Sequence, residues 1–166
     1  MLYTVFIFPV ILISAQTKAK VIAVKDGDTV VVLLGNNKQE VLRLAEVDCP
    51  EKGQPYGKNA KQFTSSQVFG KKVTFYRMNK DRYGRTVARV FYKDDKYLSA
   101  EIIKAGYGWW YYQLSKNILL KKYESLAREN KSGLWADKNA VAPWDFRKNK
   151  RKGKTKKITK SPDVAL

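Results

Sequence analysis

The feature that most limits the fold of this chain is a run of five short β-type segments interrupted by one helix. The β-type segments cover residues 19–24, 29–34, 40–47, 72–77 and 86–92. Apolar residues at helical spacing occupy 58–69, 98–105 and 118–130. Three strands, a helix, two strands and two helices is the order of a five-stranded OB-type barrel. We therefore predict an α+β fold, a β-barrel with three helices, and the fold alone leaves the function open.

Composition excludes several kinds of enzyme. The 166 residues contain no His and one Cys, which excludes His-dependent catalysis, zinc fingers and an intramolecular disulfide. The 33 Lys and Arg against 15 Asp and Glu give a formal net charge of +18. Residues 147–166 hold nine Lys or Arg and one Asp, but the rest of the chain is basic without them. Such a charge indicates a polyanionic partner, nucleic acid or an anionic surface, unless the protein is simply basic and soluble.

The N-terminus has the pattern of an export signal. Residues 1–15 contain no charged side chain, and residues 5–15 are apolar or small. A helix over 5–15 reaches only about 17 Å, against the roughly 30 Å of bilayer hydrocarbon, whereas the core of a signal peptide has this length. We predict a signal peptide over 1–15, cleavage near Ala15, and a secreted or periplasmic protein without stable membrane association afterwards. The alternative is a buried first strand or an uncleaved anchor.

Four acidic residues stand in turns of this acid-poor chain. Asp26 and Asp28 follow the first β-type segment, and Asp48 and Glu51 follow the third. The ends of the first and third strands of a meander can lie close together, so these carboxylates can converge. Oxygen ligands without His or Cys favour Ca²⁺ or Mg²⁺. The alternative is an ordinary Asp-Gly-Asp turn with an exposed Glu51.

Two arginines direct the interpretation towards phosphodiester chemistry. Arg43 lies five residues before Asp48, and Arg85 lies just before the fifth β-type segment. A guanidinium stabilises the negative charge that builds on a phosphoryl group, and a divalent cation acts there as a Lewis acid. In a chain without His, a Glu is the natural group to orient or deprotonate water. Each arginine taken alone could equally be an ordinary surface or phosphate-binding cation.

Three motifs in this order resemble the staphylococcal nuclease family. They are DGDT at 26–29, RLAEVDCPE at 43–51 and DRYGR at 81–85, and the resemblance runs over about residues 20–147. It implies an OB-type barrel with three helices at 18–147. The low-complexity basic residues at 148–166 lie outside the resemblance, and we expect them to form a disordered tail. It also implies calcium-dependent hydrolysis of DNA and RNA with low sequence specificity, cleavage of the P–O5′ bond and 3′-phosphate products.

The resemblance carries catalytic and substrate-binding roles onto the matching positions. Arg43 and Arg85 match arginines that bind the phosphate and stabilise the pentacoordinate transition state. Glu51 matches the proposed general base, with a water-orienting role as the alternative. Tyr83 and Tyr112 match positions that contact the bound nucleotide.

The same resemblance implies a calcium site. Asp28 and Asp48 match the carboxylate ligands, Cys49 offers its backbone carbonyl, and Glu51 is expected to reach the metal through a water. Asp26 matches a residue that does not contact the metal itself but supports these ligands. Since any residue can supply a carbonyl, Cys49 is compatible with this ligand position.

The chain also departs from the family pattern. The loop after Glu51 is shorter, which bears on substrate positioning, and the aromatic run at 109–112 is heavier. For Trp109 and Trp110 we favour packing over base stacking. The basic tail is additional, and either raises affinity for polyanions through counterion release or only aids solubility.

We therefore predict a monomeric, secreted, calcium-dependent nuclease acting on DNA and RNA. One alternative is a catalytically inactive nucleic-acid-binding OB-fold protein. Another is a basic structural or surface protein that adheres to anionic polymers or membranes. The acidic residues favour the enzyme, because a binding module has no need of Asp28, Asp48 and Glu51 beside the arginines.

Overall fold

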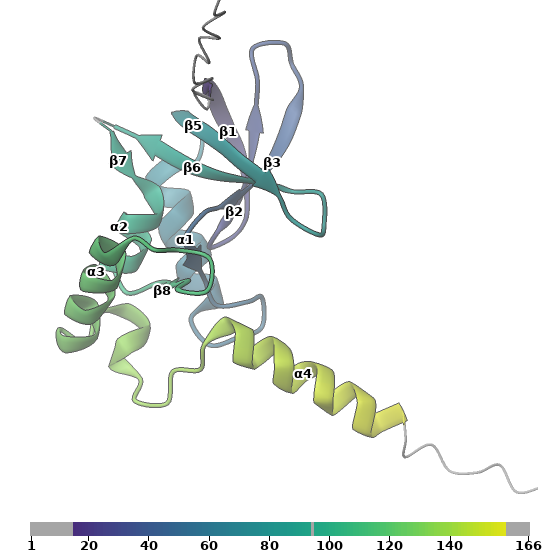
Figure 1. Ribbon diagram of the computed structural model, residues 1–166, viewed down its shortest axis with the longest axis vertical. Helices are drawn as coiled ribbons and strands as arrows, with labels where there is room; N and C mark the ends of the chain where they lie inside the picture. The colour runs from purple at the N-terminus through teal and green to yellow at the C-terminus, as the bar shows by residue number, and fades with distance from the viewer. Residues whose placement is uncertain (1–14, 94, 159–166) are drawn as a thin grey trace, which may run out of the picture.

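A closed barrel of five strands forms the centre of the computed structural model, which describes residues 15–93 and 95–158, the last six by their backbone alone (Figure 1). The strands are β1 (Gln16–Asp26), β2 (Thr29–Leu33), β3 (Gln39–Leu44), β5 (Lys72–Lys80) and β6 (Thr86–Tyr92). They lie in the order β3-β2-β1-β5-β6, and a parallel pairing of β3 with β6 closes the barrel. Val30 and Val32, two residues apart on one face of β2, are fully buried. The predicted α+β fold with an OB-type barrel is confirmed.

The third strand ends earlier than the sequence predicts, where the turns of the pocket begin. β3 stops at Leu44, and after a turn at residues 45–46 the chain forms β4 (Val47–Asp48). β4 pairs with β8 (Trp109–Trp110) in a separate two-stranded sheet. The turn thus redirects the chain away from the barrel and sets the course of the following residues 48–51.

A buried carboxylate stabilises this turn. Glu46 has a φ of +67°, a left-handed conformation that is uncommon for a residue with a side chain. Its carboxylate accepts hydrogen bonds from the hydroxyls of Tyr97 and Ser115, each at 2.9 Å, and pairs with Arg89 at 3.1 Å. These contacts offset the cost of burying the charge and hold the backbone in the turn.

Three helices cover the barrel where the sequence predicts them. They are α1 (Gly57–Val68), α2 (Leu98–Lys104) and α3 (Ile118–Glu129), each within one residue of the predicted bounds. The short strand β7 (Lys96–Tyr97) precedes α2, and a 3-10 helix, η1 (Gly133–Ala136), follows α3. α1 packs on β1, while α2 lies between β6 and α3. The main core is aliphatic and includes the fully buried Phe75 of β5.

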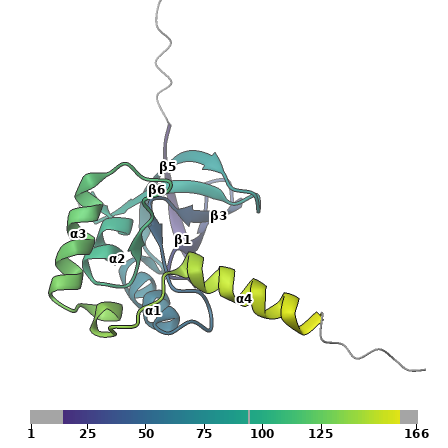
Figure 2. The same ribbon diagram turned by 60° about the horizontal axis from the view of Figure 1, so that its bottom comes forward.

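A fourth helix, α4 (Pro143–Ile158), leaves the body and projects away from it (Figures 1 and 2). The sequence predicted three helices and a disordered tail from residue 148, whereas the structure continues a helix through residue 158. Residues 159–166 lie outside the described residues. Proline suits the first turn of a helix, and the many Lys and Arg that follow are good helix formers. Asp145 in the first turn adds a favourable interaction with the helix dipole.

The predicted signal peptide lies outside the described residues except for Ala15, directly before β1. Its cleavage near Ala15 therefore stays a prediction. Within residues 15–93 and 95–158, no helix combines the length and the apolar character needed to cross a membrane.

Candidate active site

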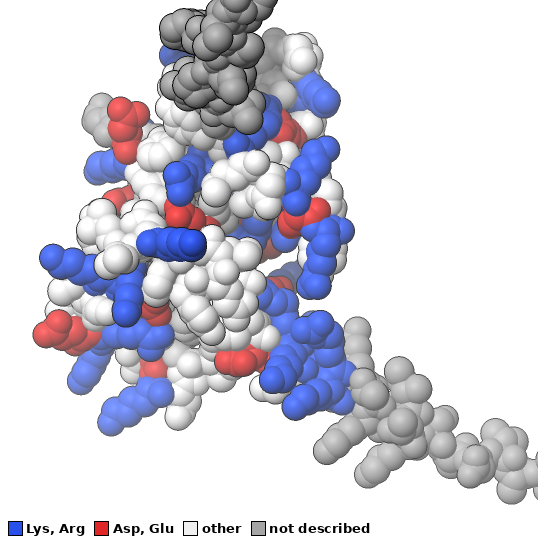
Figure 3. Space-filling view, viewed as in Figure 1, with Lys and Arg blue, Asp and Glu red and all other residues white. Residues whose placement is uncertain are grey.

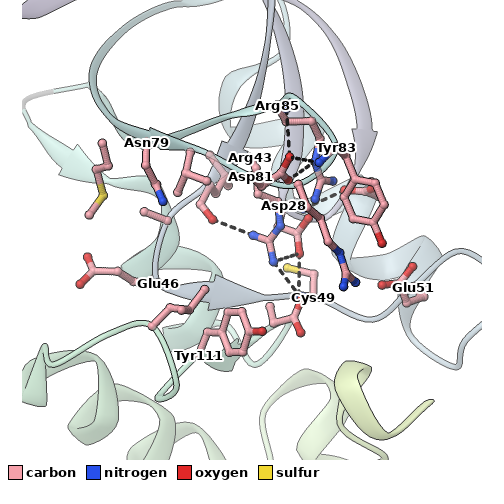
Figure 4. A pocket seen from close by; sticks show the side chains of 18 of the residues that line it. Asp28, Arg43, Glu46, Cys49, Glu51, Asn79, Asp81, Tyr83, Arg85 and Tyr111 are labelled. Atoms are coloured by element: carbon pink, nitrogen blue, oxygen red, sulfur yellow. Dashed lines mark hydrogen bonds and ion pairs between the residues drawn. The ribbon is translucent and has the colours of Figure 1, made fainter. Parts of the chain in front are cut away.

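A pocket of about 980 Å³ opens where the turns after β1 and β3 meet the hairpin between β5 and β6 (Figure 4). Residues 43–51 and the hairpin supply most of its lining, and Tyr111 and Arg147 contribute from later elements. Four lining residues are arginines and six are acidic. Such a concentration of both signs of charge is typical of a site for a charged substrate rather than an apolar ligand.

Arg43 lies at the centre of this pocket (Figure 4). Its Nη1 donates to the carbonyl oxygens of Leu44 and Val47 at 2.6 and 2.8 Å. Its Nη2 pairs with Asp48 Oδ1 at 2.8 Å and with Asp28 Oδ2 at 3.2 Å. Burial by itself lowers the pKa of Arg43, but the charges of Asp28 and Asp48 outweigh it and raise the pKa, so the guanidinium stays charged.

The two predicted carboxylate ligands, Asp28 and Asp48, both contact Nη2 of this guanidinium. The backbone N–H of Cys49 donates to Asp28 Oδ2 at 2.8 Å, which joins the turn after β1 to the turn after β4. Thr29 Oγ1 donates to the other oxygen of Asp28 at 3.1 Å. The Cys49 thiol is buried, and burial raises its pKa well above the ordinary value, so the thiol stays protonated and unreactive.

The carboxylates of this region are crowded. Asp26 Oδ1 accepts a hydrogen bond from the backbone N–H of Asp28 at 3.3 Å. Burial, with the negative charge of Asp28 adding to it, raises the pKa of Asp26 to about 6. Burial also raises the pKa of Asp48. Within the described residues, however, no three Asp, Glu or Cys side chains converge as a ready-made metal cage.

Arg85 reaches the pocket from the hairpin between β5 and β6. Its Nε pairs with Asp81 Oδ2 at 2.7 Å, and the other oxygen of Asp81 accepts the backbone N–H groups of Tyr83 and Arg85. Gly84, with φ +77°, allows the tight turn between them. The Arg85 side chain is 30% exposed and Tyr83 is 68% exposed. The hairpin therefore presents a fixed guanidinium and a neighbouring ring that a substrate can reach.

Glu51 also lines the pocket, and its carboxylate is bound by Arg147, a residue that the sequence analysis missed. Arg147 of α4 donates from Nη1 to Glu51 Oε1 at 2.6 Å and from Nη2 to Asp48 Oδ2 at 2.8 Å. Burial lowers the pKa of Arg147, but its hydrogen bonds and ion pairs with Asp48 and Glu51 outweigh this and raise it. Arg147 stands 96 residues after Glu51 and opens the basic tail, so in the sequence it looks like one more solvated cation.

Gln54 is a second missed residue that supports Glu51. The backbone N–H of Glu51 donates to Gln54 Oε1 at 3.0 Å, and Gln54 Nε2 donates to the carbonyl of Val141 at 2.6 Å. Gly57 lets α1 begin directly against this loop, because a Cβ there would overlap the Glu51 carbonyl oxygen. The loop that carries Glu51 is thus fixed from α1 and from the segment before α4.

The predicted substrate-binding tyrosines differ in their placement. Tyr83 lines the pocket, but Tyr112 is not among its lining residues. Tyr112 is 54% exposed and meets Trp144 edge to face at 5.8 Å, while Tyr111, which lines the pocket, stacks on the same ring at 5.8 Å. Trp109 is buried edge-on against Trp135 at 4.9 Å, so packing describes it better than base stacking.

Comparison with known proteins places these residues in a family. Residues 41–137 match the family described as staphylococcal nuclease homologue. An uncharacterized endonuclease of Haemophilus influenzae is 36% identical over 147 residues, covering 87% of this chain and 82% of the relative. An uncharacterized endonuclease of Escherichia coli is 36% identical over 145 residues, covering 87% of this chain and 94% of the relative. A micrococcal nuclease of Shigella flexneri is 34% identical over 146 residues, covering 81% of this chain and 82% of the relative. The family match includes Arg43, Glu51 and Arg85.

Proposed function

This chain belongs to the staphylococcal nuclease family and is a nuclease, and on that premise we propose that it hydrolyses phosphodiester bonds of DNA and RNA in the pocket around Arg43, with Ca²⁺ as its cofactor. One observation carries the proposal: a single pocket combines Arg43 and Arg85 with Asp28, Asp48 and Glu51. Phosphodiester hydrolysis needs cations for the charge that builds on the phosphoryl oxygens and an acidic group for water. A module that only binds nucleic acid needs the cations alone.

Arg43 and Arg85 are proposed to stabilise the pentacoordinate transition state. They come from β3 and from the β5–β6 hairpin, so each is held on a different element of the barrel. Arg85 is the more accessible, with 30% of its side chain exposed against 12% for Arg43. Hydrogen bonds fix both guanidinium groups in advance, which reduces the reorganisation needed when negative charge develops.

Glu51 is proposed to accept a proton from the attacking water. The water oxygen forms a bond to phosphorus, the P–O5′ bond breaks in line with it, and the O5′ leaving group takes up a proton from solvent. The products are a 3′-phosphate and a 5′-hydroxyl. Because 41% of the Glu51 side chain is exposed, water can reach its carboxylate.

Asp28 and Asp48 are proposed to hold Ca²⁺, with the Cys49 carbonyl and with Glu51 through a water, while Asp26 supports them. The donors are all hard oxygen atoms, which fit Ca²⁺. Burial and the nearby negative charge of Asp28 raise the pKa of Asp26 to about 6. A bound cation would stabilise the charged form of these crowded carboxylates. When bound, the cation supplies Lewis-acid polarisation of a phosphoryl oxygen.

The wider setting follows from the same premise. Tyr83 and Tyr112 are proposed to contact the nucleotide, and low base specificity is expected because the remaining contacts go to phosphate. We propose that the protein acts as a monomer, and that the apolar segment at 1–15 directs it to the periplasm or the medium.

Cleavage assays test the enzyme and its metal together. Purified protein is incubated with single-stranded DNA, duplex DNA and RNA in Ca²⁺, in Mg²⁺ and in chelator. Degradation in Ca²⁺ that chelator stops is the expected result. Tight binding without cleavage in either metal would instead favour the inactive nucleic-acid-binding protein.

Two variants test the assigned residues. Glu51→Gln and Arg85→Ala are each expected to lower turnover by about 100-fold or more, because each removes a group that acts in the transition state. DNA affinity should change little, and Lys58→Gln at an exposed position of α1 is the control for the positive charge that Arg85→Ala removes. Parallel loss of binding and of cleavage would contradict these roles.

A further inference from the structure

The segment from Val141 to Arg147 contacts the active site at three separate points. The Val141 carbonyl holds Gln54, the Trp144 ring stacks on Tyr111 with an interplanar angle of 8°, and Arg147 binds the carboxylates of the pocket. Figures 1 and 2 both show α4 beginning against the body before it projects outwards. The start of α4 is therefore part of the wall of the site.

From these contacts we propose that α4 completes the active site, and that Arg147 is a positioning residue which fixes Glu51 relative to Asp48. The inference rests on the proposed function of this pocket and extends it by a residue outside the three sequence motifs. Arg147 also lies beyond the family match, which ends at residue 137.

The geometry favours positioning over direct contact with the substrate phosphate. Both terminal nitrogens of Arg147 are engaged: Nη1 with Glu51 at 2.6 Å and Nη2 with Asp48 at 2.8 Å. A planar guanidinium that binds two carboxylates sets the angle and the distance between them. A lysine places its donors around one point and cannot reproduce this fork.

Glu51 needs such a restraint because its side chain is 41% exposed and extends from a loop. A glutamate in that setting samples many rotamers, and a catalytic carboxylate that is misplaced by about 1 Å can lose a hundredfold in rate. Arg147 restrains the carboxylate while Gln54 restrains the backbone of the same residue. Because each carboxylate oxygen has two lone pairs, Asp48 can bind Arg147 and still offer an acceptor to a cation.

Kinetics of three variants test the proposal. Arg147→Gln is expected to lower kcat by about 10- to 100-fold, the effect typical of residues that orient catalytic groups, with KM for a short oligonucleotide changed less than about threefold. Arg147→Lys should recover part of the loss. Lys121→Gln removes the same charge at an exposed position of α3, away from the pocket, and should behave as the wild type.

Hydrogen exchange in chelator provides a readout that needs neither metal nor substrate. In Arg147→Gln the amides of residues 51–57 should exchange about tenfold faster than in the wild type, while those of β1 and β5 are unchanged. Lys121→Gln should leave the loop protected. Exchange in β1 and β5 also reports whether a variant has lost the fold as a whole.

The possible contrary results are distinct. A rise in KM at constant kcat would overturn the proposal in favour of a phosphate contact, and a gain in activity would show that Arg147 blocks the site. Unchanged kcat and unchanged exchange in Arg147→Gln would also overturn it. A wild type that cleaves nothing, but whose loop loosens in Arg147→Gln, would count against the proposed function and not against the positioning role.

Discussion

At the scale of single residues, Gly27 shows how tightly the site is built into the core. A Cβ at this position would lie 2.7 Å from the Cβ of Cys49 and 2.8 Å from that of Ala60. Neither neighbour can rotate away, so the backbone between Asp26 and Asp28 would have to move. We expect Gly27→Ala to lower the free energy of unfolding by about 1–3 kcal/mol, and to reduce cleavage through displacement of Asp28.

Chemical denaturation and a cleavage assay measure the two effects. Gly35→Ala is the matched control, because a Cβ at Gly35, in the turn between β2 and β3, meets nothing within 4 Å. Its unfolding free energy should change by less than about 0.5 kcal/mol. A similar loss of unfolding free energy in both variants would show that any Gly→Ala change has this effect, and that the packing around Gly27 is not its cause.

The sequence predicts some residues of this pocket better than others, for a physical reason. Asp28, Arg43 and Asp48 belong to short motifs whose chemistry is visible locally, and the structure does bring them together. Arg147 and Gln54 act through contacts 87 to 99 residues away in the chain. A cation in a basic run and a glutamine in a loop carry no local signal, so only tertiary packing shows what they hold.

At the scale of elements, closure of the barrel depends on a short pairing that Glu40 reinforces. Its carboxylate binds Arg77 of β5 at 2.6 Å and accepts a hydrogen bond from Thr86 of β6 at 2.7 Å. The hydrogen bond from Arg77 lowers the pKa of Glu40 below its ordinary value of 4.5. We expect Glu40→Gln to lower the free energy of unfolding by about 0.5–1.5 kcal/mol at neutral pH.

The same pair predicts a dependence on pH. Because the pKa of Glu40 is lower in the folded state, its stabilisation is present above pH 4.5 and is lost as the pH falls through the folded pKa. The difference in unfolding free energy between the wild type and Glu40→Gln should therefore shrink in urea titrations as the pH falls below 4.5. Exposed Glu129→Gln on α3 is the control. A gap between wild type and Glu40→Gln that persists at low pH would show that packing, and not charge, explains the loss.

The spacing of apolar residues predicts the regular helices, and it fails where a tertiary contact determines where an element begins or ends. α1, α2 and α3 were predicted to within one residue because each combines apolar spacing with a clear end. The end of β3 was missed, since the buried contacts of Glu46 hold the turn there. α4 was missed because it has little apolar face, and its first turn is anchored by Trp144 and Arg147 rather than by periodic packing.

At the scale of the whole molecule, the positive charge is distributed unevenly. Lys and Arg side chains gather over the described part of α4 (Figure 3), where the exposed cations are Lys148, Lys150, Arg151 and Lys152. This helix begins at the pocket and leads away from it, so a nucleic acid bound at Arg85 and continuing past Arg147 would follow a cationic path. Long substrates should therefore benefit from α4, and short ones should not.

Replacement of these four cations, which lie in the part of α4 whose side chains the structure describes, by Gln tests this path. Removing one cation that binds a phosphate lowers the slope of log affinity against log salt by about 0.7–0.9, so removing all four should lower it by about 3. We expect kcat/KM on long DNA at 0.1 M salt to fall about tenfold or more, in proportion to the fall in affinity, while cleavage of a dinucleotide stays unchanged. Arg147 is left intact, so the chemistry of the pocket is preserved.

The control carries the same change of net charge on another face. Lys116, Lys121, Lys122 and Lys131 are exposed on α3 and its flanks, away from α4 (Figure 1). If α4 guides the substrate, their replacement by Gln should affect long DNA much less, because charges beyond about 10 Å are screened at 0.1 M salt. Equal losses in both variants would mean that affinity follows the net charge of +18 and not the path along α4. The dinucleotide separates either outcome from damage to the pocket, since it depends on the pocket alone.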